Sequence, residues 1–158
     1  DPSAEFKTAK LKNKFARGAL LERVFVEEGP ELTFVTKTGV KVTFYHFEYP
    51  LPYTERFGRV IDMPTLLTLA AMKAFAIGQR NKWKDYVDLY FIMRDFHSLD
   101  DIIHQAEKLF GSEFNAKLFR QQLSFFDDIS YKEEVTFKSG FAVPEAEIKR
   151  ALTEYSLA

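Results

Sequence analysis

The sequence predicts an α+β fold, in which a small antiparallel meander sheet is followed by a bundle of helices. Short segments with strand-like alternation lie between residues 21 and 47, and segments with helical spacing fill the chain from residue 62 onward. Because strands come first and helices afterwards, the order favours α+β over an alternating, doubly wound fold. We expect residues 1–61 to form a sheet-containing lobe and residues 62–158 a helical lobe packed against it.

The expected sheet has three main strands, at residues 21–27, 32–37 and 40–47. Apolar and polar residues alternate along the second and third, as in strands with one buried face. Thr38-Gly39 separates this pair, and a Gly there suits a tight hairpin turn. Residues 1–17 look helical, and residues 58–61 are expected to form one more short strand after a Pro-rich loop.

The helical part begins at Asp62, the expected N-cap, and its first helix is predicted to end at Ile77, before Gly78. Ser98 with Asp101 three residues later resembles a capping box and opens a later helix. The other expected helices cover residues 82–95, 113–124 and 144–155.

Composition excludes several classes of site and of protein. With no Cys in the sequence there is no disulfide, thiolate nucleophile or Cys-ligated zinc. Uninterrupted apolar runs are far shorter than the roughly 20 residues of a membrane helix, so we expect no membrane association and a cytoplasmic location. Net charge is only −1. A basic cluster in the first helix is either a solvated face or a phosphate contact; its members are Lys7, Lys10, Lys12, Lys14 and Arg17.

Candidate functional residues gather between residues 63 and 93, where charges interrupt apolar helices. Lys73 falls on an apolar stripe that includes Ala70 and Ile77, so it must either reach solvent or hold a partner. Asp88 lies in a helix that is apolar on nearly every face. Lys84, four residues earlier, is placed to pair with Asp88, and Asp85 lies on a neighbouring face.

Two interpretations of these charges stay open at this point. They form an ion-pair network that pins two helices together, or they grip nucleotide phosphates or a metal, or orient an attacking hydroxyl. Asp127-Asp128 is better explained as a loop or helix cap than as a Mg²⁺ site, because adjacent side chains on a helix point about 100° apart. The His residues show no zinc-ligand spacing.

The same segment resembles the AbiEii/AbiGii toxin-like nucleotidyltransferases, a family of abortive-infection proteins. The resemblance rests on Ala70-Ala71-Met72-Lys73, on Arg80, and on the run Lys84-Asp85-Tyr86-Val87-Asp88-Leu89-Tyr90. It extends to residues 40–45 with Tyr49-Pro50, and to Phe125-Phe126-Asp127-Asp128. The resemblance implies the nucleotidyltransferase fold with a C-terminal helical region.

The resemblance also implies an activity. The complete protein would transfer a nucleotidyl group from an NTP to an acceptor such as tRNA, as the toxin of a toxin–antitoxin pair or of a phage-defence system. NTP and Mg²⁺ would be its cofactors, and a cognate antitoxin protein its partner. Lys73 and Arg80 would contact the nucleotide phosphates, and Lys84, Asp85 and Asp88 would form the catalytic part of the site.

Two departures from the family limit this assignment. The Gly-rich turn with a metal-binding carboxylate pair is absent from the 158 residues, and Thr43 stands where many members carry an acid. We therefore assign no metal ligand and expect the chain to be the C-terminal portion of a longer enzyme, inactive by itself, or a degenerate relative. The alternatives are a non-catalytic helical domain that binds a protein partner, and a nucleic-acid-binding module that uses the first helix and residues 80–84.

Overall fold

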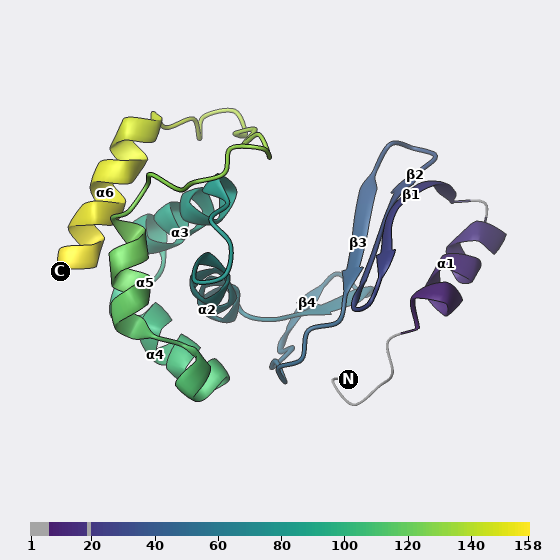
Figure 1. Cartoon of the computed structure of the whole chain (residues 1–158), viewed down its shortest axis with the longest axis horizontal. Helices are drawn as coiled ribbons and strands as arrows, with labels where there is room; N and C mark the ends of the chain where they lie inside the picture. Colours follow the sequence, from purple (N-terminus) through teal and green to yellow (C-terminus); the bar gives the residue numbers. More distant parts are fainter. Residues whose placement is uncertain (1–6, 19) are drawn as a thin grey trace. The chain divides into compact units, whose positions relative to one another are not determined.

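The computed structural model describes residues 7–18 and 20–158, and the chain divides into two compact units, Asp1–Pro50 and Leu51–Ala158. Both units are drawn in Figure 1. The fold class is α+β, as the sequence predicts. The expected domain division between residues 61 and 62 remains a prediction; that position lies in the second unit, within β5 (Ile61–Met63).

The first unit is built on an antiparallel meander of β1 (Leu21–Glu28), β2 (Glu31–Thr36) and β3 (Lys41–Tyr45), in the order β1-β2-β3. This confirms the three strands expected between residues 21 and 47. Gly39 has φ +79° in the β2–β3 turn, a conformation that side chains other than Gly disfavour, so the turn needs this residue. In the register, Leu32 faces Phe44 and Thr33 faces Thr43.

Helix α1 (Thr8–Arg17) packs on one face of this sheet. Its Phe15 ring lies 5.0 Å from the Phe34 ring and 5.3 Å from the Phe44 ring, between centroids. Phe34 and Leu32 are fully buried, so β2 supplies the core of this unit. The helix expected over residues 1–17 is confirmed from Thr8 onward, and residues 1–6 lie outside the described part of the chain.

The second unit opens with a hairpin, β4 (Glu55–Phe57) and β5 (Ile61–Met63). The strand predicted at residues 58–61 is wrong, because Gly58 has φ +59° and residues 58–60 form the turn between the two strands. Asp62 is therefore a strand residue and not an N-cap. Thr65 takes that place, and its hydroxyl accepts a hydrogen bond from the Thr68 amide at 3.1 Å.

The helices follow the predicted order closely. Ser98 and Asp101 form the expected capping box, with the Asp101 amide 3.1 Å from the Ser98 hydroxyl. A short 3₁₀ turn η1 (Gly111–Glu113) and the N-cap Asn115 delay the start of the helix expected at residue 113. The helices are α2 (Leu66–Ile77), α3 (Trp83–Asp95), α4 (Leu99–Phe110), α5 (Ala116–Leu123) and α6 (Glu145–Leu157).

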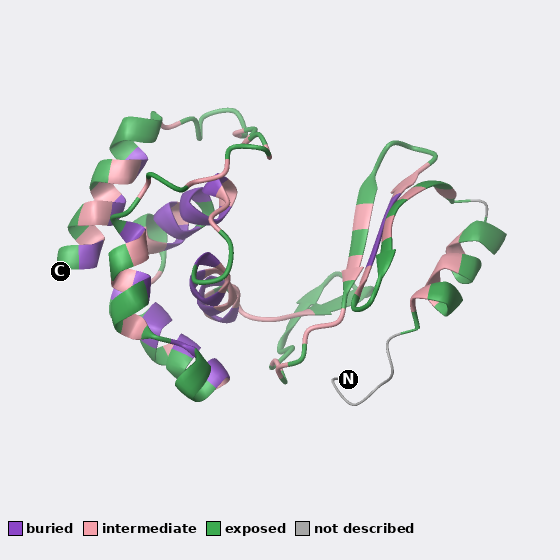
Figure 2. Ribbon diagram, in the orientation of Figure 1, coloured by how far each residue is buried: buried purple, intermediate pink, exposed green. Residues whose placement is uncertain are grey.

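Helix α2 is the centre of the second unit, in contact with α3, α4 and α5. Figure 2 shows buried residues on the inward sides of these helices. Ala70, Ala71 and Ala74 are buried on α2, and such small side chains let neighbouring helices approach closely. Phe75 stacks on Phe110 of α4 at 4.2 Å between ring centroids. Within the described residues, no helix is long and apolar enough to cross a membrane.

Candidate functional site

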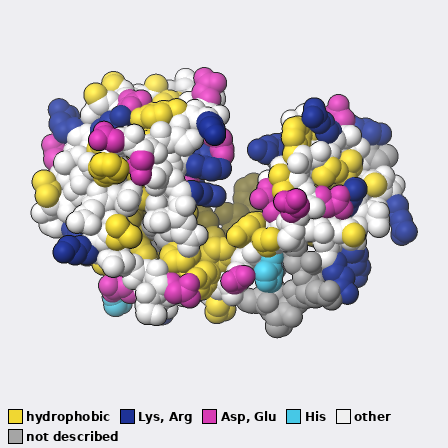
Figure 3. Space-filling model, in the orientation of Figure 1, with side chains coloured by type: hydrophobic (Ala, Val, Ile, Leu, Met, Phe, Trp, Pro, Cys, Tyr) yellow, Lys and Arg dark blue, Asp and Glu magenta, His cyan; other side chains and the backbone are white. Residues whose placement is uncertain are grey.

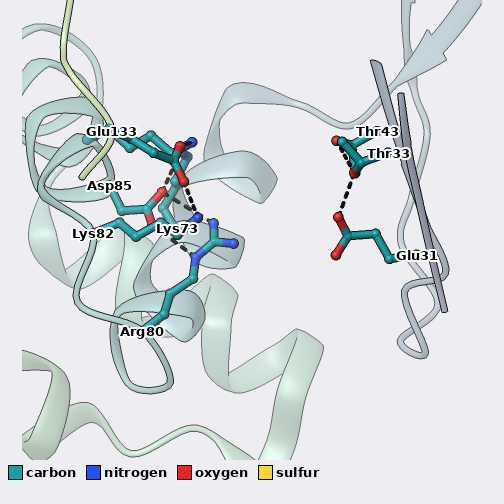
Figure 4. Close-up of polar contacts among 9 residues, drawn as sticks. Glu31, Thr33, Thr43, Lys73, Arg80, Lys82, Asp85 and Glu133 are labelled. Carbon is teal, nitrogen blue, oxygen red and sulfur yellow. Dashed lines mark hydrogen bonds and ion pairs between the residues drawn. The ribbon is translucent and has the colours of Figure 1, made fainter. Parts of the chain in front are cut away.

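Four charged residues of α2, α3 and their connecting loop form one ion-pair network, which we call the Lys73 cluster: Lys73, Arg80, Asp85 and Asp88. The Lys73 ammonium lies 2.7 Å from Asp85 Oδ1 and 2.5 Å from Asp88 Oδ2. Arg80 Nε donates to Asp85 Oδ2 at 3.1 Å. Figure 4 shows Lys73 and Arg80 converging on the Asp85 carboxylate. The sequence-predicted site residues other than Lys84 thus lie together.

Asp85 is the buried member of the cluster, with no exposed surface, whereas Asp88 is 50% exposed. The sequence had pointed to Asp88 as the charge within an apolar helix; the helix turns Asp85 toward α2 instead. A carboxylate inside a protein needs cations or donors close by, and here both of its oxygens have one. Asp85 therefore holds Lys73 and Arg80 in fixed positions.

Lys73 stays charged in this setting. Burial alone would lower the pKa of its ammonium, but the hydrogen bonds to Asp85 and Asp88 outweigh that effect and raise the Lys73 pKa above its ordinary value. Its side chain is 28% exposed. The sequence allowed Lys73 either to reach solvent or to hold a partner. In the structure Lys73 does both, because it holds two carboxylates and also reaches the rim of the bundle.

Lys84 does not pair with Asp88 along the helix, as the spacing had suggested. It pairs with Glu133, which also binds Lys82, so that each oxygen of one carboxylate takes one ammonium. We call these three residues the Glu133 bridge. The two Lys side chains hold the pKa of the Glu133 carboxyl well below its usual range. Asp88 pairs with Lys73 instead.

The segment that carries Glu133 is fastened to the loop before α3 by backbone and side-chain contacts. Asn81 Nδ2 donates to Asp128 at 2.5 Å, and the Ser130 amide donates to the Asn81 carbonyl at 2.6 Å. The Trp83 amide donates in turn to the Ser130 carbonyl at 3.1 Å. Asp128 thus makes a contact between two loop segments, in line with the loop interpretation favoured for the Asp127-Asp128 pair.

Asn81, Ser130 and Glu133 are site neighbours that sequence reasoning missed. Glu133 lies 49 positions after Lys84, in a segment without helical or strand-like spacing of apolar residues, so no local pattern predicts the contact. The one available signal was the excess of Lys around residues 82–84, which calls for an acidic partner from elsewhere in the chain.

The residues present do not fit a Mg²⁺ ion. Among residues 7–18 and 20–158, no group of three or more His, Asp or Glu side chains is placed to hold a metal. Asp85 is taken by Lys73 and Arg80, and Asp88 by Lys73, so an added cation would compete with ammonium and guanidinium groups already in place. Metal-assisted chemistry would need carboxylates other than these two.

Thr43 contributes an uncharged hydroxyl to the sheet of the first unit. Its hydroxyl lies 2.8 Å from the Thr33 hydroxyl, which donates to Glu31 Oε1 at 2.6 Å (Figure 4). Because the Thr33 proton goes to Glu31, Thr43 is the donor to Thr33. The strand pair thus presents one carboxylate, at Glu31, and two hydroxyls at this point.

Helix α1 carries a basic surface on the first unit. Figure 3 shows Lys and Arg side chains over this part of the molecule. Lys12 is tied to Glu27 at 2.6 Å, and the turns of α1 contain no acid to balance the remaining basic side chains. Such a surface suits contacts with a phosphate backbone, which position a nucleic acid without reading its sequence.

The comparisons with known proteins agree with the resemblance. The family model of the nucleotidyl transferase AbiEii toxin, type IV TA system, matches residues 26–155. The uncharacterized protein aq_aa25 of Aquifex aeolicus (strain VF5) is 29% identical over 124 residues, which cover 74% of this chain and 58% of that protein. The chain thus spans less than two thirds of this relative's length. No solved structure gives a significant match.

The family match covers most of the chain: part of β1, all of β2 and β3, and the second unit up to Tyr155. The Lys73 cluster and the Glu133 bridge lie inside the matched range. The chain belongs to the AbiEii family of nucleotidyl transferase toxins of type IV toxin–antitoxin systems.

Proposed function

We propose that the protein transfers a nucleotidyl group from an NTP to an acceptor such as tRNA, and that the Lys73 cluster holds the phosphates of the NTP. The observation that carries this proposal is the Lys73 ammonium, held by a buried and a half-exposed carboxylate in a member of the AbiEii family. We further propose that the activity is that of a toxin, restrained in the cytoplasm by a cognate antitoxin protein and used in phage defence.

The cluster is expensive as a purely structural device, which supports a functional role. Burying charges costs desolvation energy that even good pairing often only offsets, and well-packed apolar residues usually stabilise as well or better. Asp85 is completely buried and Lys73 is 28% exposed, and the other buried residues of α2 and α3 are apolar or aromatic except for Thr68. Stability alone therefore does not explain why these charges lie between the two helices.

Lys73 and Arg80 keep donors for a phosphate. Lys73 is 28% exposed and Arg80 is 50% exposed. Arg80 uses Nε and Nη2 on Asp85, which leaves Nη1 for an anion. A guanidinium and an ammonium at one rim suit the charge of a phosphate chain, and groups already fixed by Asp85 do not have to reorganise when the ligand binds.

The predicted catalytic residues take different parts in this proposal. Asp85 has no exposed surface, so it acts by positioning Lys73 and Arg80 and not by touching substrate. Asp88 is half exposed and reaches solvent beside Lys73, where an acceptor hydroxyl would approach. Lys84 adds another cation in the first turn of α3. No step is assigned to a metal held by these residues.

The proposal is tested by NTP binding to the full-length protein, measured by isothermal titration calorimetry below the melting temperature of each variant. Lys73→Ala is expected to weaken NTP affinity at least tenfold. Lys108→Ala, an exposed Lys on α4 without an ion pair in the described chain, is the matched control and should bind as the wild type does. Unchanged affinity in a folded Lys73→Ala protein would remove Lys73 from the site.

A further inference from the structure

The Glu133 bridge has the geometry of an anion site that is occupied from within. Lys82 and Lys84 both reach Glu133, and the two carboxylate oxygens of Glu133 take one ammonium each. All three side chains are between 36% and 39% exposed, so the point at which they meet is open to solvent. Two oxygens on one centre are also what a phosphate group presents to a pair of Lys side chains.

We propose that Lys82 and Lys84 form a phosphate-binding site, which the carboxylate of Glu133 fills until a phosphate group displaces it. This inference rests on the proposed function, because the phosphate would belong to the NTP or to a nucleic-acid acceptor. It adds a second anion site beside the Lys73 cluster and gives Glu133 the part of a competing internal ligand.

The local charges favour a phosphate over the carboxylate. Lys82 is the N-cap of α3 and Lys84 lies in its first turn, where the helix dipole adds positive potential to that of the side chains. Asp85 is the acidic residue of this turn, but Lys73 and Arg80 already use its charge. Two ammonium groups therefore face the single negative charge of Glu133, and a phosphate with more negative charge balances them better.

Glu133 is placed so that it can leave without unfolding its segment. Contacts on the preceding side, from Ser130 to Asn81 and from the Tyr131 hydroxyl to Glu145 at 2.8 Å, hold the chain independently of Glu133. The carboxylate also borders a pocket of about 330 Å³ lined by Trp83, Tyr131 and Val135 among others. These ion pairs are partly exposed and screened by solvent, so a phosphate group from solution can compete with this carboxylate.

The test compares three proteins of equal design, each full-length: wild type, Glu133→Gln and Glu134→Gln. Glu134 is exposed, makes no ion pair within the described residues and changes net charge by the same amount, so it controls for general electrostatics. Calorimetry with inorganic tripolyphosphate, an NTP and a short single-stranded RNA measures affinity at fixed salt, and a melting curve shows that each protein is folded.

Glu133→Gln is expected to raise phosphate affinity about five- to tenfold, and Glu134→Gln less than twofold. Adding Lys82→Ala and Lys84→Ala to Glu133→Gln should abolish the gain. A gain for tripolyphosphate and NTP assigns the site to the nucleotide, and a gain for RNA alone assigns it to the acceptor. Equal affinities for Glu133→Gln and Glu134→Gln would overturn the inference, whether or not the melting temperature falls.

Failure of this inference and failure of the proposed function are distinguishable. If Lys73→Ala loses NTP binding while Glu133→Gln binds as the control does, the Lys73 cluster stands and the second anion site is refuted. If Lys73→Ala binds NTP normally, the proposed role of Lys73 fails on its own, and the comparison of Glu133→Gln with Glu134→Gln on tripolyphosphate still decides the Lys82–Lys84 site.

Discussion

Replacing Asp85 by Asn is the sharpest perturbation of the Lys73 cluster. Asn keeps the size of the side chain and one acceptor oxygen, but it removes the buried negative charge and turns an N–H₂ group toward a cation. Lys73 then keeps only the half-exposed Asp88, and Arg80 loses its carboxylate partner. The change isolates the charge of Asp85 from its packing.

Removal of one partner from a buried ion pair typically costs about 3–5 kcal/mol. Because Lys73 and Arg80 are 28% and 50% exposed and can regain water, we expect the lower end, about 3 kcal/mol. For a unit of the size of Leu51–Ala158 this corresponds to a fall of roughly 10 °C in Tm. Asp88→Asn, which loses one contact near solvent, should cost about 1 kcal/mol or less.

The assay is urea unfolding followed by circular dichroism, with both variants and the wild type at pH 7 and two salt concentrations. The difference between Asp85→Asn and Asp88→Asn should persist in 0.5 M NaCl, because a buried pair is screened much less than an exposed one. Equal unfolding free energies for the two variants, or an Asp85→Asn protein as stable as the wild type, would refute the assignment of Asp85 as the anchor of the cluster.

Further predictions concern the Glu133 bridge, the capping box and the basic surface of α1. The two Lys side chains lower the pKa of Glu133 to about 2, so the ion pairs contribute their full stabilisation above pH 4.5. The free energy of unfolding of the wild type should therefore fall between about pH 4.5 and 2, and that of Glu133→Gln should not show this loss. Identical pH dependence in the two proteins would contradict the bridge. Ser98→Ala should lower the free energy of unfolding by about 1 kcal/mol through loss of the cap, whereas Ser139→Ala, in an exposed turn, should leave it unchanged. RNA binding by α1 should weaken steeply with salt, and Lys10→Ala with Lys14→Ala should reduce the slope of log K against log salt by about 2; a slope equal to that of the wild type would exclude α1 from the contact.

Local patterns in the sequence were sufficient for most elements of the fold. Alternation indicated β2 and β3, and Gly39, Gly78 and the capping box at Ser98 indicated turns and helix ends, because each of these signals acts within a few residues. The hairpin β4–β5 was missed for the converse reason. Its strands are three residues each, too short to show a period, and its turn at Gly58 was taken for the start of a strand.

The candidate site could be predicted only as far as helical geometry reaches. Helical spacing predicted that Lys84 would pair with Asp88 and that Lys73 would reach solvent or hold a partner, but it did not name Asp85 and Asp88 as the partners of Lys73. Which carboxylate was buried depended on the packing of α3 against α2, and the partner of Lys84 depended on a segment 49 positions away. Both are tertiary facts that no local pattern contains.

Nucleotidyl transfer itself is the measurement that decides whether the Lys73 cluster serves this reaction. Full-length wild type and Lys73→Ala are incubated with total tRNA and each α-³²P-labelled NTP in turn, with Mg²⁺ present and at a temperature where both proteins are folded. We expect labelled tRNA with the wild type for at least one NTP, and at least a tenfold lower rate with Lys73→Ala. Equal labelling by the two proteins, or no labelled RNA with any NTP, would contradict it.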